Sequence, residues 1–181
     1  DEKDEKNDEK DEKSDKKKDL GNIFIGFAIL IFGMDLMSDS MVSVRELPGF
    51  ESFLGTLKSP IIALIVSTVF TGVIQSSAAT IGIVQALALS GGITWEMAIP
   101  LVLGANIGTC ITSILSSAGA QVNAKRTAIV HLLFNVFGCL IFIVPLWIFK
   151  PQIARVFASI SSDVGRQIAV FHTLFNVVII T

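Results

Sequence analysis

The chain has 181 residues, of which 51% are apolar and 17% charged, and its mean hydropathy is +0.68. A soluble domain carries more charge than this, about 25% of its residues, and a net charge of −2 provides no basic surface for nucleic acid. The segment from Pro60 to Ala124 holds one charged residue, Glu96, whereas a soluble helix needs a polar face along its length. We therefore predict an all-α membrane protein.

Residues 1–19 form a charged, low-complexity segment with ten acidic and seven basic residues. Because this segment has no apolar residue, it cannot bury a surface that offsets its ordering entropy. We predict that it is a disordered, solvated linker, and a helix with Glu–Lys pairs is the alternative. Residues 20–181 form the predicted transmembrane domain. We expect both ends to continue in a longer protein, because the first residue is not methionine and the last lies in an apolar run.

Apolar stretches follow the charged segment, and Asp35 is the only acidic residue inside one of them. This aspartate is predicted to be either an interfacial residue or a buried cation ligand. Two of the stretches, 97–119 and 127–149, fit single membrane crossings, since about 20 helical residues span the hydrocarbon core. The complete set lies near residues 20–37, 61–90, 97–119, 127–149 and 168–181.

The stretch 61–90 is too long for one straight crossing. As a continuous helix it would measure roughly 45 Å, against a hydrocarbon core of about 30 Å. We predict that it is interrupted at its polar centre, residues 71–80, and that it therefore forms a discontinuous helix or a re-entrant hairpin. Such a break is tolerated at membrane depth only where protein or a wet cavity satisfies the backbone.

The polar centre contains the sequence Gln75-Ser76-Ser77. A helix that restarts near Ser76 would direct free backbone N–H groups and the positive end of its dipole into the break, which is a ready anion site. On the preceding helix, Ser67, Thr71 and Gln75 form one polar stripe at i, i+4 and i+8. The alternative is that these small residues only allow neighbouring helices to approach closely.

A second polar segment lies at residues 104–109 and reads GANIGT. Asn106 and Thr109 share a helix face that continues through Ser113 and Ser116. The two glycines favour an unwound turn whose carbonyl oxygens would suit Na⁺. A packed seam of small residues is the equal alternative.

The third candidate is a repeated sequence motif, HLLFNV at 131–136 and HTLFNV at 172–177. Each copy places a histidine and an asparagine at i and i+4 on one helix face, as the pairs His131–Asn135 and His172–Asn176. Ionisable groups within apolar spans are candidates for function. Hydrogen bonding between helices is the other role we predict for these side chains.

These motifs together resemble the Na⁺/phosphate cotransporter family, especially its bacterial members. The resemblance rests on four sequences: QSSAAT at 75–80, LGANIGT at 103–109, HLLFN at 131–135 and GMDLM at 33–37. The last resembles the sequence that opens each repeat in that family. The resemblance covers residues 20–181. Where many relatives have a third serine, this chain has Ala78, which removes one hydroxyl group.

The resemblance implies an inverted-repeat secondary transporter in the plasma membrane, of which this chain is one repeat, the second QSS-containing one. The implied partners are inorganic phosphate, Na⁺, membrane lipid and the first repeat, without nucleic acid. No cofactor is expected, and Na⁺ is the coupling ion and the only metal. We assign Ser76 and Ser77 to phosphate and Gln75, Thr80, Asn106 and Thr109 to Na⁺ or to site geometry. Possible further site residues are Asp35, His131, Asn135, His172 and Asn176.

Two other functions remain compatible with the sequence. An intramembrane serine hydrolase would use Ser76 or Ser77 as nucleophile and a histidine, His131 or His172, as base, which requires hydrogen-bond contact. The sequence QSSAA is not the strained small-residue elbow that presents such a serine. A purely structural half, whose binding site forms only with its partner repeat, is compatible with transport. We do not expect the chain to be an enzyme.

Overall fold

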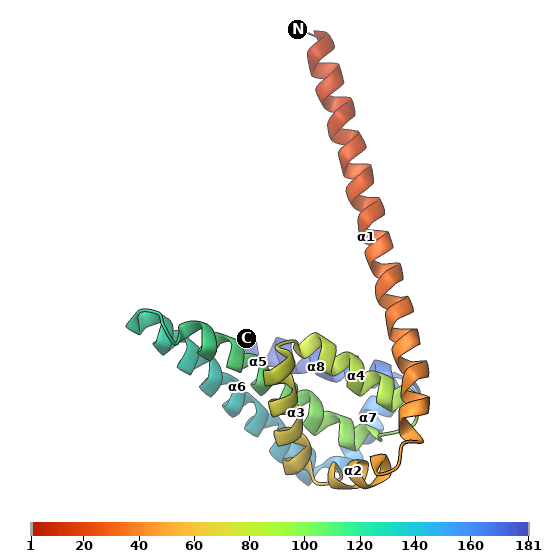
Figure 1. Cartoon of the computed structure of the whole chain (residues 1–181), viewed down its shortest axis with the longest axis vertical. Helices are drawn as coiled ribbons and strands as arrows, with labels where there is room; N and C mark the ends of the chain where they lie inside the picture. The colour runs from red at the N-terminus through yellow and green to blue at the C-terminus, as the bar shows by residue number, and fades with distance from the viewer. Residues whose placement is uncertain (1, 181) are drawn as a thin grey trace. The chain divides into compact units, whose positions relative to one another are not determined.

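A computed structural model describes residues 2–180, and every helix or strand element within them is an α-helix (Figure 1). The all-α prediction is therefore confirmed. The chain divides into two units, Asp1–Met37 and Ser38–Thr181, which are described separately. The helices are α1 (Glu2–Arg45), α2 (Phe50–Thr56), α3 (Pro60–Ile74), α4 (Ser77–Leu89), α5 (Trp95–Ser117), α6 (Val122–Ile148), α7 (Lys150–Ile160) and α8 (Val164–Ile180).

The first unit consists of the larger part of α1. The part of α1 from Asp15 to Val44, which continues beyond the first unit, is long and apolar enough to cross a membrane. Side chains such as Phe24 and Phe32 are exposed. The charged segment also belongs to this helix from Glu2 onward, which is the alternative conformation considered above. An exposed ion pair between Lys18 and Asp15, 3.2 Å apart at i,i+3, matches helical spacing. That residues 1–19 form a solvated linker, and that the transmembrane domain begins at residue 20, remain predictions.

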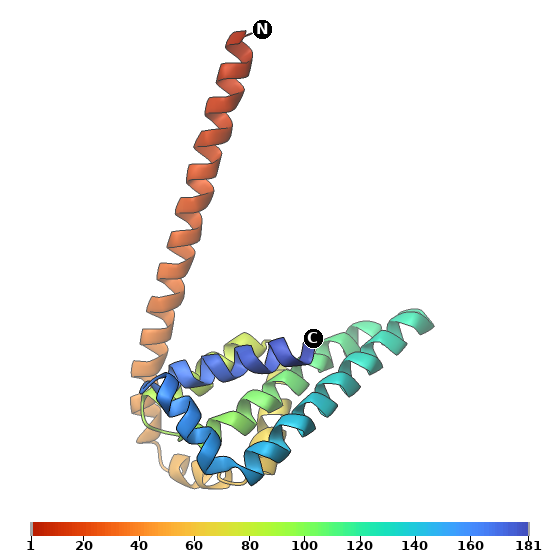
Figure 2. The same ribbon diagram turned by 180° about the vertical axis from the view of Figure 1, so that it is seen from behind.

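The second unit contains the two crossings predicted at 97–119 and 127–149. These are α5 and α6, with 23 and 27 residues, and both are long and apolar enough to span a membrane. The two helices form a hairpin and lie side by side (Figure 2). Most of α6 is exposed, and only 11% of its apolar window is buried, as expected for a helix that faces lipid.

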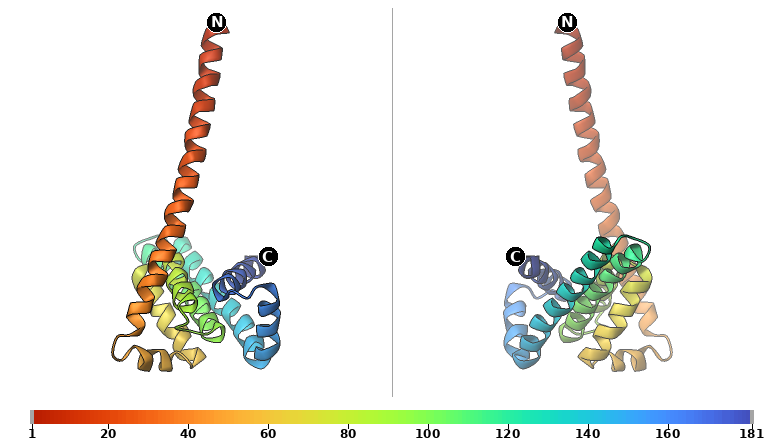
Figure 3. Two further views of the ribbon diagram at one scale, coloured as in Figure 1. Left: turned by 90° about the vertical axis from the view of Figure 1, so that its right-hand side faces the viewer. Right: turned by 90° about the vertical axis from the view of Figure 1, so that its left-hand side faces the viewer.

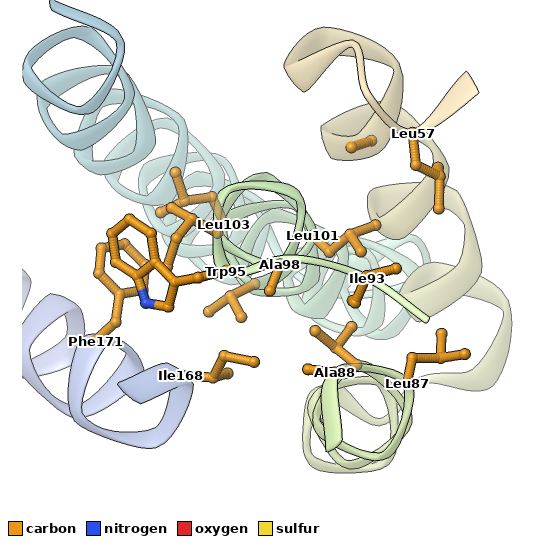
Figure 4. Close-up of a cluster of buried hydrophobic side chains, with 14 of the residues drawn as sticks. Leu57, Leu87, Ala88, Ile93, Trp95, Ala98, Leu101, Leu103, Ile168 and Phe171 are labelled. Carbon is orange, nitrogen blue, oxygen red and sulfur yellow. The ribbon is translucent and has the colours of Figure 1, made fainter. Parts of the chain in front are cut away.

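Helix α5 is the centre of the second unit, because α3, α4, α6 and α8 all pack against it. Ala98, Val102 and Leu103 of α5 are completely buried. Helix α7 turns the chain so that α8 returns against α4 and α5 (Figure 3), and there Ile168 and Phe171 of α8 pack into the same core (Figure 4). Since lipid tails are as apolar as leucine, dispersion contacts and close approach hold such a bundle together more than transfer from water does.

Candidate functional site

The long apolar stretch 61–90 is broken where the sequence predicts it. Helix α3 ends at Ile74 and α4 begins at Ser77, so two residues interrupt the helix. Gln75 has left-handed backbone angles (φ 58°, ψ 26°) and Ser76 is extended (φ −141°, ψ 102°). Gln75 is the one non-glycine residue with positive φ in the described part of the chain. The discontinuous helix is therefore confirmed.

Each side of the break carries a helix cap. At the end of α3, the backbone N–H of Gln75 donates to the carbonyl of Thr71 at 2.7 Å, in the left-handed capping conformation that glycine usually provides. At the start of α4, the Ser76 hydroxyl accepts a hydrogen bond from the Ala79 N–H at 3.2 Å, which is the ordinary role of an N-cap serine. The sequence therefore encodes a stop and a restart, without proline.

A chain of hydrogen bonds braces the two helices across the break. The Thr71 hydroxyl on α3 donates to the Thr80 hydroxyl on α4 at 2.9 Å, and the Thr80 hydroxyl donates to the Ser76 carbonyl at 3.2 Å. Both threonines are buried. Thr80 has thus used its proton and one lone pair for structure, and one lone pair is left for an ion.

The start of α4 offers a row of free donors. Among the described residues, the backbone N–H groups of Ser76, Ser77 and Ala78 have no hydrogen-bond partner, and the Ser77 hydroxyl has none either. The two serines are half-exposed and Ala78 is exposed. Free N–H groups at the positive end of a helix form an anion site. In a membrane they require a partner, because unsatisfied polar groups are costly in hydrocarbon.

For the second polar segment, on α5, the structure decides between the two predicted alternatives. Helix α5 runs without interruption through residues 104–109, so the unwound turn is wrong and the packed seam is correct. A Cβ atom on Gly104 would lie 2.3 Å from the carbonyl oxygen of Leu64, and one on Gly108 would lie 2.6 Å from that of Thr68. These glycines therefore let the backbones of α3 and α5 touch, which requires no local unwinding.

This seam brings α5 to the last turn of α3 before the break. A Cβ atom on Gly108 would also lie 2.6 Å from the Cβ atom of Thr71. Asn106 is buried, and its Nδ2 donates to the Val102 carbonyl, whereas the Thr109 hydroxyl donates to the Ala105 carbonyl. Within the described residues, neither side chain hydrogen bonds to the residues of the break, so their Na⁺ role stays a prediction.

The histidine–asparagine pairs have the same local geometry in α6 and α8. The amide Nδ2 of Asn135 donates to the carbonyl of His131 at 3.0 Å, and that of Asn176 to the carbonyl of His172 at 2.8 Å. The ring of His131 lies 3.9 Å from the Cys110 sulfur on α5. In the region the structure describes, neither histidine hydrogen bonds to Ser76 or Ser77, and the hydrolase alternative gains no geometric support.

Two features extend the sequence-based site. Thr71 lies on the predicted polar stripe but was not among the predicted site residues, although it forms the brace to Thr80. Thr68 was missed altogether, and its hydroxyl bonds to the carbonyls of Leu64 and Gly104. The cluster of hydroxyl residues at 67, 68 and 71 in the middle of α3 was the available signal. Asp35 is exposed and belongs to the first unit, so its role as an ion ligand stays a prediction.

The chain is similar in sequence to several known proteins. YqeW of Bacillus subtilis (strain 168) is 34% identical over 164 residues, which cover 89% of this chain and 52% of YqeW. YjbB of Escherichia coli (strain K12), whose name refers to inorganic phosphate export, is 26% identical over 88% of this chain and 29% of its own. Sodium-dependent phosphate transport protein 2B of Homo sapiens is 34% identical over 62% of this chain and 17% of its own.

The chain thus spans about half the length of YqeW and less of the other two relatives. No solved structure matches it significantly. The sequence profile of the Na⁺/Pi-cotransporter family matches residues 44–165, which include the break, the seam and the first histidine–asparagine pair. The chain is an integral membrane protein that belongs to the Na⁺/Pi-cotransporter family.

Proposed function

We propose that this chain is one of two repeats of a sodium-coupled transporter of inorganic phosphate, and that the phosphate binds at the start of α4. The observation that carries the proposal is the row of unpartnered N–H groups at Ser76, Ser77 and Ala78. The Ser77 hydroxyl adds a donor on the same turn. A tetrahedral oxyanion accepts several such donors at once.

The charge balance of the site argues for a coupled cation. No lysine or arginine lies between Lys58 and Lys125 in the sequence. Burying an unpaired anion in a medium of low dielectric is strongly unfavourable. A cation that binds with the phosphate lowers this free energy, and amide and hydroxyl oxygens are suitable ligands for Na⁺.

Four side chains are assigned to the cation or to the geometry of its site. Gln75 is exposed at the break and offers an amide oxygen. Thr80 retains one lone pair beyond its brace. The remaining two, Asn106 and Thr109, lie on the α5 helix that packs against the end of α3.

A partner repeat would complete the site. Gln75, Ala78 and Ala79 are exposed in this chain, although they lie in an apolar segment that requires a protein or water environment at a helix break. Inverted repeats that place two broken helices at the membrane midplane provide this environment. In this scheme, further candidate site residues lie outside the break: Asp35, His131, Asn135, His172 and Asn176.

The relatives support this choice of substrate. One is named for sodium-dependent phosphate transport and another for inorganic phosphate export.

Reconstitution of the intact transporter in vesicles tests the proposal. We expect phosphate uptake to follow an inward Na⁺ gradient and to disappear when K⁺ replaces Na⁺. Uptake that is independent of sodium would overturn the coupling. The double substitution S76A/S77A should abolish uptake, whereas the control S159A, which alters an exposed serine of α7, should leave it unchanged. Equal uptake by both variants would refute the anion site.

A further inference from the structure

A cavity lies away from the helix break, where the ends of three helices converge. It has a volume of about 500 Å³ and is lined by residues at the N-termini of α3 and α5 and the C-terminus of α6. This volume is within the range of small-molecule sites, about 300–1,000 Å³. All of its lining residues belong to the second unit.

The floor and walls of the cavity are apolar. Ile99 and Pro100 of α5 are buried beneath it, and Ile143 and Leu146 of α6 are half-buried along its side. Pro100 has no N–H group to donate to the carbonyl of Glu96 one turn earlier. The α5 terminus therefore presents both a carboxylate and a backbone carbonyl as acceptors beside an apolar slot.

Two cations lie at the rim. Lys58, between α2 and α3, and Lys150, at the start of α7, both line the cavity and are exposed. In the part of the chain that the structure describes, neither lysine side chain forms a hydrogen bond or an ion pair, and Lys150 acts on the Glu96 carboxylate through its charge. With Glu96, the three side chains leave one net positive charge at the mouth of the cavity.

Both tryptophans of the chain, Trp95 and Trp147, line this cavity. Tryptophan and lysine are enriched where a membrane helix meets the headgroup layer, so these residues place the cavity at the depth of lipid headgroups. Trp95 is also 93% buried, and its indole Nε1 is the single buried side-chain nitrogen or oxygen in the described residues that has no hydrogen-bond partner.

We propose that this cavity binds one anionic phospholipid of the surrounding membrane. The two lysines bind the headgroup phosphate, the acceptors of Glu96 receive hydroxyl hydrogens of the headgroup, and an acyl chain occupies the apolar slot between α3 and α6. The combination of cationic rim, apolar slot and interfacial tryptophans favours a lipid over a free ion, because a free phosphate makes no use of the apolar walls.

Quenching of tryptophan fluorescence by brominated lipid tests the proposal, since both tryptophans line the cavity. The full chain is placed in phosphatidylcholine vesicles that contain increasing amounts of brominated phosphatidylglycerol or brominated phosphatidylcholine. We expect half-maximal quenching at a lower mole fraction of phosphatidylglycerol. Equal quenching by the two lipids, as when another part of the protein fills the cavity, overturns the proposal.

Charge variants locate the effect. We expect each of K58Q and K150Q to raise the mole fraction for half-maximal quenching by about fivefold, the effect of one lysine near an anionic lipid surface. The matched control K125Q/R126Q alters two cations at the opposite end of α6 and should keep the preference. The variant K58R/K150R conserves both charges and should also keep it. If the glutamine variants retain the preference, or the arginine variant loses it while remaining helical by circular dichroism, the assignment is wrong.

A competition experiment separates lipid from free phosphate. Inorganic phosphate and sulfate are added at equal ionic strength to vesicles with brominated phosphatidylglycerol. We expect no specific release of quenching by phosphate. Release by phosphate alone would assign the cavity to the free ion and overturn the lipid proposal.

Discussion

The substitution Gln75→Gly separates a structural role of this residue from an ion-binding role. Gln75 has φ 58°, and a non-glycine residue in the left-handed region costs about 1–2 kcal/mol. Glycine removes this cost but loses about 0.5–1 kcal/mol through its greater freedom in the unfolded chain. Because the Gln75 side chain is exposed, little packing is lost. We expect the free energy of unfolding to change by less than about 1 kcal/mol.

Transport should respond differently. If the Gln75 amide oxygen binds Na⁺, its loss removes an interaction with a charged group, worth about 1.5–3 kcal/mol. That corresponds to a decrease in apparent Na⁺ affinity of roughly 10-fold to 150-fold. The assay is phosphate uptake by the intact transporter in vesicles, titrated with Na⁺, together with the unfolding midpoint in detergent.

The control is Gln75→Asn, which keeps an amide and tolerates the left-handed conformation. It should retain more Na⁺ affinity than the glycine variant at similar stability. If the glycine variant transports phosphate with unchanged Na⁺ dependence, Gln75 is a helix cap and nothing more, and the cation assignment is refuted.

Four further substitutions test the surroundings of the break. Thr80→Val removes the brace and leaves the buried Thr71 hydroxyl without a partner, whereas the Ser76 carbonyl keeps the backbone N–H of residue 80. We therefore expect a loss of about 1–3 kcal/mol in unfolding experiments; unchanged stability would contradict the brace. Gly108→Ala forces α3 away from α5 and should cost about 1–3 kcal/mol and slow uptake, whereas Gly33→Ala, with nothing within 4 Å, should cost nothing. Ser76→Ala should lose about 1 kcal/mol of stability as an N-cap. Ser77→Ala should keep stability and weaken half-saturation by phosphate; if it instead destabilises the protein with transport unaffected, its assigned role is wrong.

The break illustrates what can be predicted from local sequence. A stretch of 30 uncharged residues is longer than the membrane is thick, and the polar residues at its centre mark where it must open. The structure opens it between Ile74 and Ser77. The N-cap function of Ser76 follows from the same local chemistry, because serine is a common residue at the start of a helix.

The α5 segment shows where local reasoning is ambiguous. Gly104 and Gly108 are compatible both with an unwound turn and with close helix packing. Only the position of the α3 backbone, 2.3 Å and 2.6 Å from the sites of the added Cβ atoms, decides between them. A sequence read one helix at a time contains no information about that neighbour.

The sequence by itself determined that this is a membrane protein, that it is all-α and where its helix break lies, because charge, hydropathy and capping act over a few residues. The tertiary structure alone decided that Thr71 braces Thr80, that the α5 glycines form a seam, and that Lys58, Trp95, Trp147 and Lys150 share one cavity. These contacts join residues on different helices, and their geometry depends on how the helices pack, which no local pattern specifies.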